Sequence, residues 1–154
     1  MTRGWCFGSR LTSFLIDRAS TCADHQVMLN NQDMGDSGGE VVSLGTILIL
    51  EDEVLVSILI EDLMRDMGAS EVIVLADAAQ ALEQVIRLPP DLAILDIHVG
   101  ADTSFAVADA LDTRNIPFMF SSALAGVDVQ PRHSHRPMLS KPFSDEELRA
   151  HVLG

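Results

Sequence analysis

The sequence predicts an α/β protein, a doubly wound sandwich with helices on both faces of a five-stranded parallel sheet. Short apolar runs without polar alternation recur from residue 47 onward, and such runs are typical of strands buried on both faces. Stretches with helical spacing separate the runs, and right-handed crossovers then distribute the helices over both faces. The five runs are ILIL (47–50), VIVL (72–75), LAIL (92–95), PFMF (117–120) and ML (138–139).

The first helix is predicted between the first two runs, over EVLVSILIEDLMRDMG (53–68). Apolar residues recur there every four positions, which predicts a core-facing stripe, and Gly68 supplies a C-terminal cap. The stripe consists of Leu55, Leu59, Leu63 and Met67. A second apolar stripe, Val56, Ile60 and Met64, leaves two interpretations open: other parts of the chain cover it, or it is a docking or dimer surface.

Three further helices are predicted. DAAQALEQVIRL (77–88) ends at a proline pair, SFAVADALDTR (104–114) follows the third run, and Ser144 with Glu147 forms a capping box that opens the last helix. Residues 123–137 show no helical stripe, so the helix that the alternation requires there is expected to be short or missing. The RHSHR stretch (132–136) is interpreted as a solvated loop rather than a metal site of two histidines.

Composition limits the class of protein. The 154 residues suit one domain, and the net charge of −13 argues against nucleic acid or an anionic membrane as partner. The longest apolar runs are about half of the ~20 residues that a membrane span needs. Two cysteines without metal spacing fit a reducing cytoplasm. Residues 1–45 are expected to be a flexible N-terminal extension with at most a short helix near 11–18, and residues 46–154 the folded domain.

Chemically active residues follow the predicted strands. The first strand is followed by Glu51-Asp52-Glu53, the third by Asp96, the fourth by Ser121-Ser122, and the fifth by Lys141, the only lysine of the chain. Because the carboxyl ends of parallel strands share one edge of a sheet, these side chains are expected to converge there. Clustered carboxylates need a cation, and Mg²⁺ is the expected one. A carboxylate in such a site can become an aspartyl phosphate, with lysine and serine stabilising the developing charge.

Four motifs in this order resemble the receiver domain of two-component response regulators: ILILEDE, PDLAILDIHVG, PFMFSSA and LSKPFSDEEL. The resemblance covers residues 46–154 and implies a flavodoxin-like fold with strand order 2-1-3-4-5. It makes Asp96 the phosphoacceptor, Ser122 the switch hydroxyl and Lys141 the phosphate-binding ammonium. The resemblance implies that Mg²⁺ is bound by Asp96, by Asp52 directly, by Glu51 mostly through water, and by the backbone carbonyl of His98. It also implies a cis peptide bond between Lys141 and Pro142.

Two positions depart from the family pattern. Met138 stands where an aromatic switch residue is usual, three positions before the lysine. The fourth strand reads Phe120-Ser121-Ser122-Ala123, close to the F-A-T-G of the FAT GUY single-domain receivers, which are associated with bacterial stress and light-sensing kinases. The expectation is therefore a receiver near that subgroup, with no DNA-binding output domain after Gly154.

The expected function is that of a single-domain response regulator. It takes a phosphoryl group from a sensor histidine kinase or a phosphotransfer protein and acts by protein contact or as a phosphate sink, with a homodimer as a further option. It is not expected to be an enzyme beyond its own phosphorylation and dephosphorylation. Two alternatives stay open: a pseudo-receiver that binds a partner without phosphorylation, and an aspartate-nucleophile phosphatase, although Asp96-Ile97-His98 lacks the second acid such enzymes need.

Overall fold

The computed structural model describes residues 43–123 and 129–154. The sheet and the helices α2, α3 and α4 belong to one compact unit of the chain. The extension predicted over residues 1–45, with its short helix near 11–18, falls almost entirely outside the described residues. The boundary predicted at residue 45 therefore stays a prediction.

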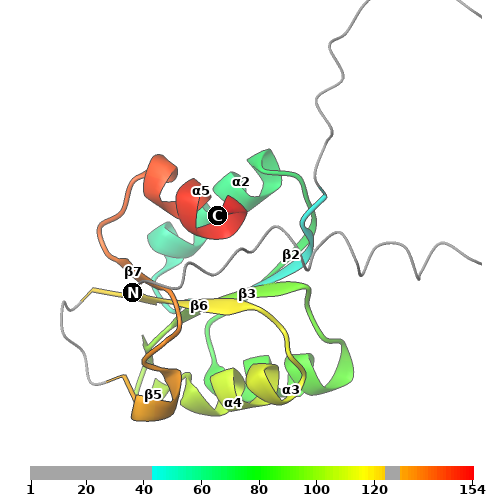
Figure 1. Cartoon of the computed structure of the whole chain (residues 1–154), viewed down its shortest axis with the longest axis vertical. Helices are drawn as coiled ribbons and strands as arrows, with labels where there is room; N and C mark the ends of the chain where they lie inside the picture. The colour runs from blue at the N-terminus through cyan, green and yellow to red at the C-terminus, as the bar shows by residue number, and fades with distance from the viewer. Residues whose placement is uncertain (1–42, 124–128) are drawn as a thin grey trace, which may run out of the picture. The chain divides into compact units, whose positions relative to one another are not determined.

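Five parallel strands form the sheet in the order β2-β1-β3-β6-β7, which is the predicted order 2-1-3-4-5 (Figure 1). All four pairings between neighbours are parallel. Each predicted apolar run lies in one strand, except that Pro117 precedes β6, so the doubly wound α/β fold is confirmed. The strands are β1 (Gly45–Leu50), β2 (Ala69–Leu75), β3 (Leu92–Asp96), β6 (Phe118–Ser122) and β7 (Met138–Ser140).

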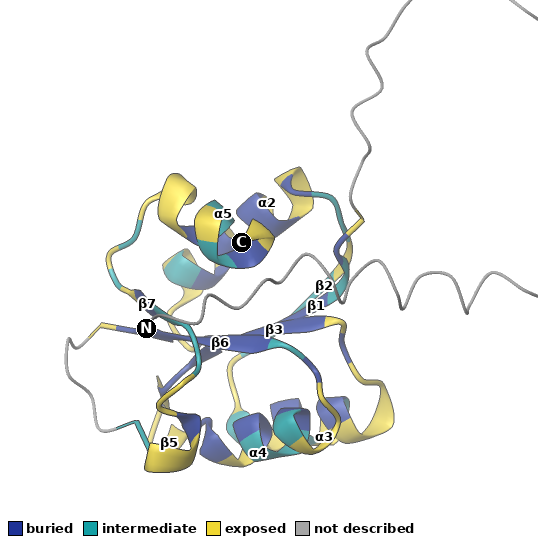
Figure 2. Cartoon of the chain, in the orientation of Figure 1, coloured by how far each residue is buried: buried dark blue, intermediate teal, exposed yellow. Residues whose placement is uncertain are grey.

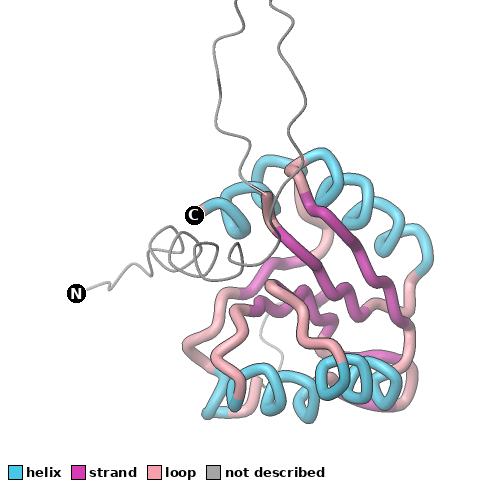
Figure 3. Tube along the Cα trace, turned by 90° about the vertical axis from the view of Figure 1, so that its right-hand side faces the viewer, coloured by secondary structure: helices cyan, strands magenta, loops and turns pink. Residues whose placement is uncertain are grey.

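Helices cover both faces of this sheet. In Figure 1, α2 (Val54–Asp66) and α5 (Asp145–Leu153) lie on one side, and α3 (Ala78–Arg87) and α4 (Phe105–Thr113) on the other. Figure 3 shows helices on both sides of the strands. The predicted capping box opens α5: the Ser144 backbone N–H donates to Glu147 Oε2 (2.7 Å), and the Glu147 N–H donates to Ser144 Oγ (3.2 Å). None of the helices among the described residues is long and apolar enough to cross a bilayer.

The core lies on both faces of the central strands, as Figure 2 shows. Residues 47–50 of β1 are fully buried, and every residue of β3 and β6 is buried. The edge strand β2 is only partly covered. This difference explains why the central strands have no polar alternation at all: both faces of each are packed against helices.

The buried face of α2 differs from the prediction. Leu55 and Leu59, placed in the core stripe, are 78% and 42% exposed, whereas Ile60 and Met64 are fully buried. A stripe of strict four-residue spacing drifts by about 40° at each step around a helix of 3.6 residues per turn. The buried residues are separated by three or four positions across successive turns and therefore stay on one face: Ser57, Ile60, Leu63, Met64 and Met67.

The segment between β6 and β7 contains, in its described part, only the 3₁₀ turn η1 (Pro131–His133). This agrees with the expected short or missing helix. The RHSHR stretch, however, is not simply a solvated loop, because His133 is 1% exposed while His135 is exposed. A two-stranded hairpin that the sequence analysis missed, β4 (His98–Val99) with β5 (Asp102–Thr103), follows β3.

Candidate functional site

The acidic residues predicted from the strand ends lie together at the carboxyl edge of the sheet. Glu51, Asp52 and Asp96 each offer one carboxylate oxygen, and these oxygens lie within 4.8 Å of one another. Glu51 and Asp52 directly follow β1, and Asp96 is the last residue of the neighbouring β3. The parallel pairing of the two strands is therefore what brings residues 45 positions apart into one cluster.

Lys141 lies between two of these carboxylates. Its Nζ donates to Glu51 Oε2 at 2.5 Å and to Asp96 Oδ2 at 2.6 Å, and its side chain is 10% exposed. The backbone N–H of Lys141 donates to the carbonyl oxygen of Ser122 (2.8 Å), which fixes the lysine to the end of β6. The peptide bond to Pro142 is cis, as the sequence resemblance implied.

Burial and charge shift the ionisation of this pair. Burial raises the pKa of Glu51 above its usual value, and the hydrogen bond from Lys141 offsets part of that rise. Burial lowers the pKa of Lys141, but the hydrogen bonds that its ammonium donates to Asp96 and Glu51 outweigh this effect and hold its pKa above the usual value. The lysine is therefore a permanent positive charge at neutral pH, and a divalent cation in the cluster would draw the pKa of Glu51 down again.

Backbone N–H groups hold the acids from the other side. The N–H of His98 donates to Asp96 Oδ1 (3.2 Å), and the N–H of Gly100 donates to Asp52 Oδ2 (2.9 Å). Gly100 occupies the turn of the β4–β5 hairpin with φ +60, a conformation that glycine adopts at little cost. Gly100 was not among the predicted site residues, although a glycine four positions after Asp96 is a turn signal that could have indicated it.

The donor set fits Mg²⁺. This ion prefers hard oxygen ligands, carboxylates among them. Glu51, Asp52 and Asp96 each offer one such oxygen, and the three oxygens lie within 4.8 Å of one another. Three carboxylates face one ammonium, so the cluster keeps an excess of negative charge that a divalent cation would neutralise.

The two serines at the end of β6 are both buried. Ser121 pairs in register with Asp96, and its hydroxyl has no hydrogen-bond partner among the described residues. Ser122 is 3% exposed and is the last residue of β6. The switch role of Ser122 and the metal-ligand role of the His98 carbonyl stay predictions. The His98 side chain is exposed.

A doubly wound sheet of this strand order, with acids and a lysine at its carboxyl edge, defines a signalling domain of the receiver type. The chain matches the response regulator receiver domain family over residues 47–153, more than half of its length. It therefore belongs to this family. Its placement near the FAT GUY subgroup stays a prediction.

Solved structures agree with this assignment. SdrG from Sphingomonas melonis Fr1 is 35% identical with a TM-score of 0.63, and the match covers 71% of this chain and 97% of that one. The receiver domain of PhyR from Erythrobacter litoralis is 29% identical with a TM-score of 0.55, over 70% of this chain and 85% of that one.

A third neighbour bears on the fold alone, because it is 21% identical, with a TM-score of 0.57. It is the receiver domain of the sensor histidine kinase PA1611 from Pseudomonas aeruginosa PAO1. That structure holds a magnesium ion coordinated in its active site cleft, and the match covers 70% of this chain and 93% of that one.

Proposed function

We propose that this chain is a stand-alone response regulator whose Asp96 accepts a phosphoryl group from the phosphohistidine of a sensor kinase or a phosphotransfer protein. The observation that carries the proposal is the position of Lys141, whose ammonium binds both Glu51 and Asp96. One ammonium faces three carboxylates, so the cluster keeps an excess of negative charge. Such a set is suited to hold a cation and a phosphoryl group together.

Each residue has a defined part in the transfer. A carboxylate oxygen of Asp96 attacks the phosphorus, the new O–P bond forms, and the P–N bond to the donor imidazole breaks. Lys141 exchanges its bond to Asp96 for one to a phosphoryl oxygen, and the Ser122 hydroxyl donates to another. Asp52, Asp96, Glu51 through water and the His98 carbonyl would hold Mg²⁺, which neutralises charge on the phosphoryl oxygens.

Hydrolysis of the aspartyl phosphate by water returns the site to its starting state. The protein is thus a switch rather than a metabolic enzyme. We place it in the cytoplasm, where the phosphorylated domains of sensor kinases and Mg²⁺ are found together. The net charge of −13 disfavours nucleic acid as a target, so the output is contact with another protein or the draining of phosphate from a shared kinase.

Mass spectrometry after incubation with a small phosphoryl donor and Mg²⁺ tests the assignment. The wild type is expected to gain one phosphoryl group, and Asp96→Asn to gain none. Asp109→Asn, which removes an acid of α4 outside the cluster, is the matched control and is expected to gain the group as the wild type does. If the wild type gains nothing from small donors or candidate kinases, the chain is a pseudo-receiver. Steady release of phosphate from monoesters would instead favour the phosphatase alternative.

The start of α2 is the surface we propose for the kinase. Four apolar side chains are exposed there, beside the acidic cluster: Val54 67%, Leu55 78%, Ile58 49% and Leu59 42%. Single exposed apolar residues are ordinary, but four on one helix next to a reactive site mark a docking surface. Because the phosphohistidine must reach Asp96, a partner seated on this patch is placed to deliver it.

Leu55→Glu is expected to slow transfer from the kinase at least tenfold while leaving phosphorylation by a small donor unchanged. Ile86→Glu supplies the matched control, since Ile86 is an apolar residue of α3 that is 54% exposed. Equal slowing in both variants would contradict the assignment of the patch. Loss of self-association in Leu55→Glu, with the kinase rate unchanged, would make the patch a homodimer surface instead.

A further inference from the structure

A second ionic cluster lies between α4 and the RHSHR stretch, away from the acidic site. Arg132 binds Asp109 with two hydrogen bonds, Nε to Oδ1 and Nη2 to Oδ2, both 2.7 Å. Arg136 pairs with Asp112, and its guanidinium stands over the ring of Phe118 at 4.4 Å from the centroid. The four charged groups neutralise one another in pairs.

His133 is the centre of this cluster and is 1% exposed. Its Nε2 lies 2.9 Å from Asp109 Oδ1, and its Nδ1 lies 3.1 Å from Asp112 Oδ2 without forming a hydrogen bond. The hydrogen bonds from Arg132 hold the pKa of Asp109 below its usual value, so this carboxylate is ionised and can only accept. The proton of the contact to Asp109 is therefore on Nε2.

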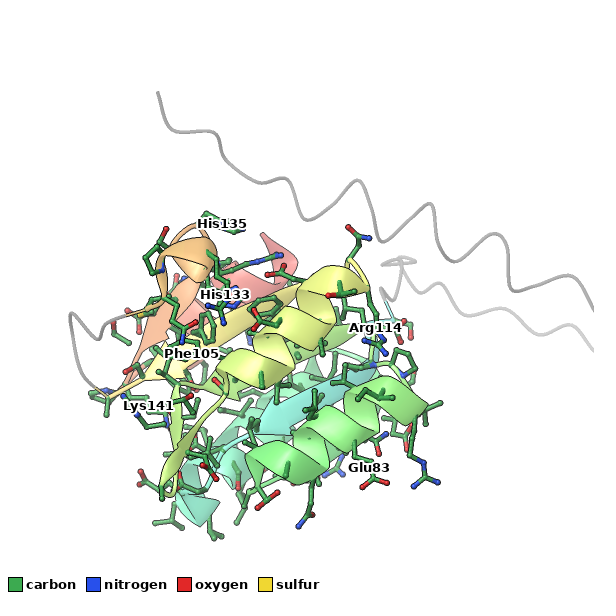
Figure 4. All side chains as sticks on the ribbon, turned by 90° about the horizontal axis from the view of Figure 1, so that it is seen from below. Glu83, Phe105, Arg114, His133, His135 and Lys141 are labelled. Carbon is green, nitrogen blue, oxygen red and sulfur yellow. The ribbon has the colours of Figure 1, made fainter. Side chains whose placement is uncertain are left out.

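The imidazole ring of His133 also packs against three aromatic rings. The ring of His133 stacks on Phe105 at 6.2 Å between centroids and meets Phe118 and Phe120 edge to face, both at 5.9 Å. Figure 4 shows His133 directed inward near Phe105, with His135 on the outside. The His133 side chain thus contacts α4 through both its nitrogens and its ring, and β6 through its ring.

Phe120 connects this ring to the acidic site. It pairs in register with Leu95, and the next residue, Ser121, pairs with Asp96. On its other side Phe120 pairs with Met138, three residues before Lys141. Any movement at the end of β6 therefore displaces a ring that is packed directly against His133, because a close-packed core transmits small shifts.

Resting on the proposed function above, we propose that His133 is a positioning residue that transmits the state of Asp96 to α4. Phosphorylation moves the end of β6, Phe120 moves with it, and the His133 ring changes its contacts with Asp109 and Asp112. The charged surface of α4 and η1 is thereby rearranged. In this proposal the ring of His133 carries the signal. Met138, the β7 residue paired with Phe120, has no ring that could do so.

Nuclear magnetic resonance of the full ¹⁵N-labelled chain tests the proposal, with beryllium fluoride and Mg²⁺ as the phosphoryl mimic. The imidazole signals of His133, assigned by their loss in His133→Phe, are expected to shift several times more than those of His151. His151 is a fitting reference because it lies on α5, where its Nδ1 is 2.8 Å from the Glu147 carbonyl oxygen of the same helix.

Two outcomes separate this proposal from the function on which it rests. If the amide signals of Ser122 and Lys141 shift and those of His133 do not, the transmission role is wrong and the receiver function stands. If none of these signals shifts and no phosphoryl mass is gained on Asp96, the proposed function fails and the transmission role with it.

His133→Phe distinguishes transmission from simple packing. Phenylalanine keeps a ring among the three aromatic neighbours but has no nitrogen for Asp109 or Asp112. The variant is expected to keep the mimic-induced shift at Lys141 and to lose most of the shift at Asp109 and Asp112. An unchanged response on α4 would overturn the proposal. Should the variant fold poorly, Asp112→Asn on the partly exposed face of α4 gives the same test, with a reduced response expected at His133.

Discussion

The two ionic clusters of this protein are built from similar groups and differ in balance. At the carboxyl edge of the sheet, three carboxylates face one ammonium, and the Glu51 and Lys141 side chains are 1% and 10% exposed. At α4, two aspartates face two arginines, and the Arg132 and Asp109 side chains are 52% and 46% exposed. In the first cluster Glu51 and Lys141 are buried while Asp52 is exposed, and negative charge is in excess. In the second cluster the charges balance, with the Arg132–Asp109 pair exposed and the Arg136–Asp112 pair 17% and 30% exposed.

This difference indicates what each cluster is for. Buried charge of one sign costs free energy unless a partner neutralises it, so an unbalanced cluster at a strand edge is suited to a ligand. A balanced exposed cluster needs no ligand and stabilises the fold only slightly. Its value lies in geometry: it holds His133 against β6.

The largest expected effect is that of removing Lys141. Lys141→Ala leaves Glu51 and Asp96 buried without their cation, and we expect the free energy of unfolding to fall by about 3 kcal/mol, measured by urea denaturation without Mg²⁺. Arg132→Ala, which removes a cation from the exposed pair with Asp109, is expected to lower the free energy of unfolding much less. Equal losses would remove the distinction between the clusters.

Mg²⁺ binding tests the role of Lys141 in the acidic cluster. Lys141→Ala is expected to keep Mg²⁺ affinity, because removing a positive charge makes the acids more attractive to a cation, and to lose the response to phosphorylation. A loss of Mg²⁺ binding in this variant would contradict the role assigned to the lysine. Fluorescence or calorimetric titration of the full chain measures the affinity.

An intermediate effect is expected from the metal itself. Mg²⁺ at ten times its dissociation constant should raise the free energy of unfolding of the wild type by about 1.4 kcal/mol. Asp52→Asn should lose most of this gain, since it removes a ligand charge from the acidic cluster. Asp109→Asn should keep it. Stabilisation that survives in Asp52→Asn would place the ion elsewhere.

The smallest expected effect concerns pH and the balanced cluster. The pKa of Asp109 is lowered chiefly by its hydrogen bonds with Arg132. The ionised carboxylate therefore stabilises the fold fully at pH values above its pKa in the unfolded chain, about 4. This stabilisation is lost as the pH falls through the lower pKa of the folded protein. The difference in unfolding free energy between wild type and Asp109→Asn should therefore be larger at pH 6 than at pH 3. It should stay below about 1 kcal/mol because the pair is exposed.

If that difference is the same at both pH values, Asp109 does not gain its stability from the ion pair with Arg132. Urea denaturation of both proteins at the two pH values, with the other conditions held fixed, measures it.

Particular elements show how far sequence patterns reach. The strands were predictable because an unbroken apolar run such as ILIL indicates a strand that is buried on both faces. The predicted core stripe of α2 is right at its C-terminal end, where Leu63 and Met67 are buried, and wrong at its start, where Leu55 is exposed. Two apolar stripes overlap on this helix, and only packing against the sheet selects between them. The burial of His133 could not be predicted from RHSHR, since it depends on rings contributed by α4 and β6.

The sequence by itself determined the family, the order of the elements and the gathering of acids and lysine at one edge, because local apolar period and strand-end position carry that information. The tertiary structure alone decided which face of α2 is left exposed, that Gly100 donates to Asp52, and that His133 joins α4 to β6. Each of these depends on contacts between residues distant along the chain, which form only once the sheet has brought them together.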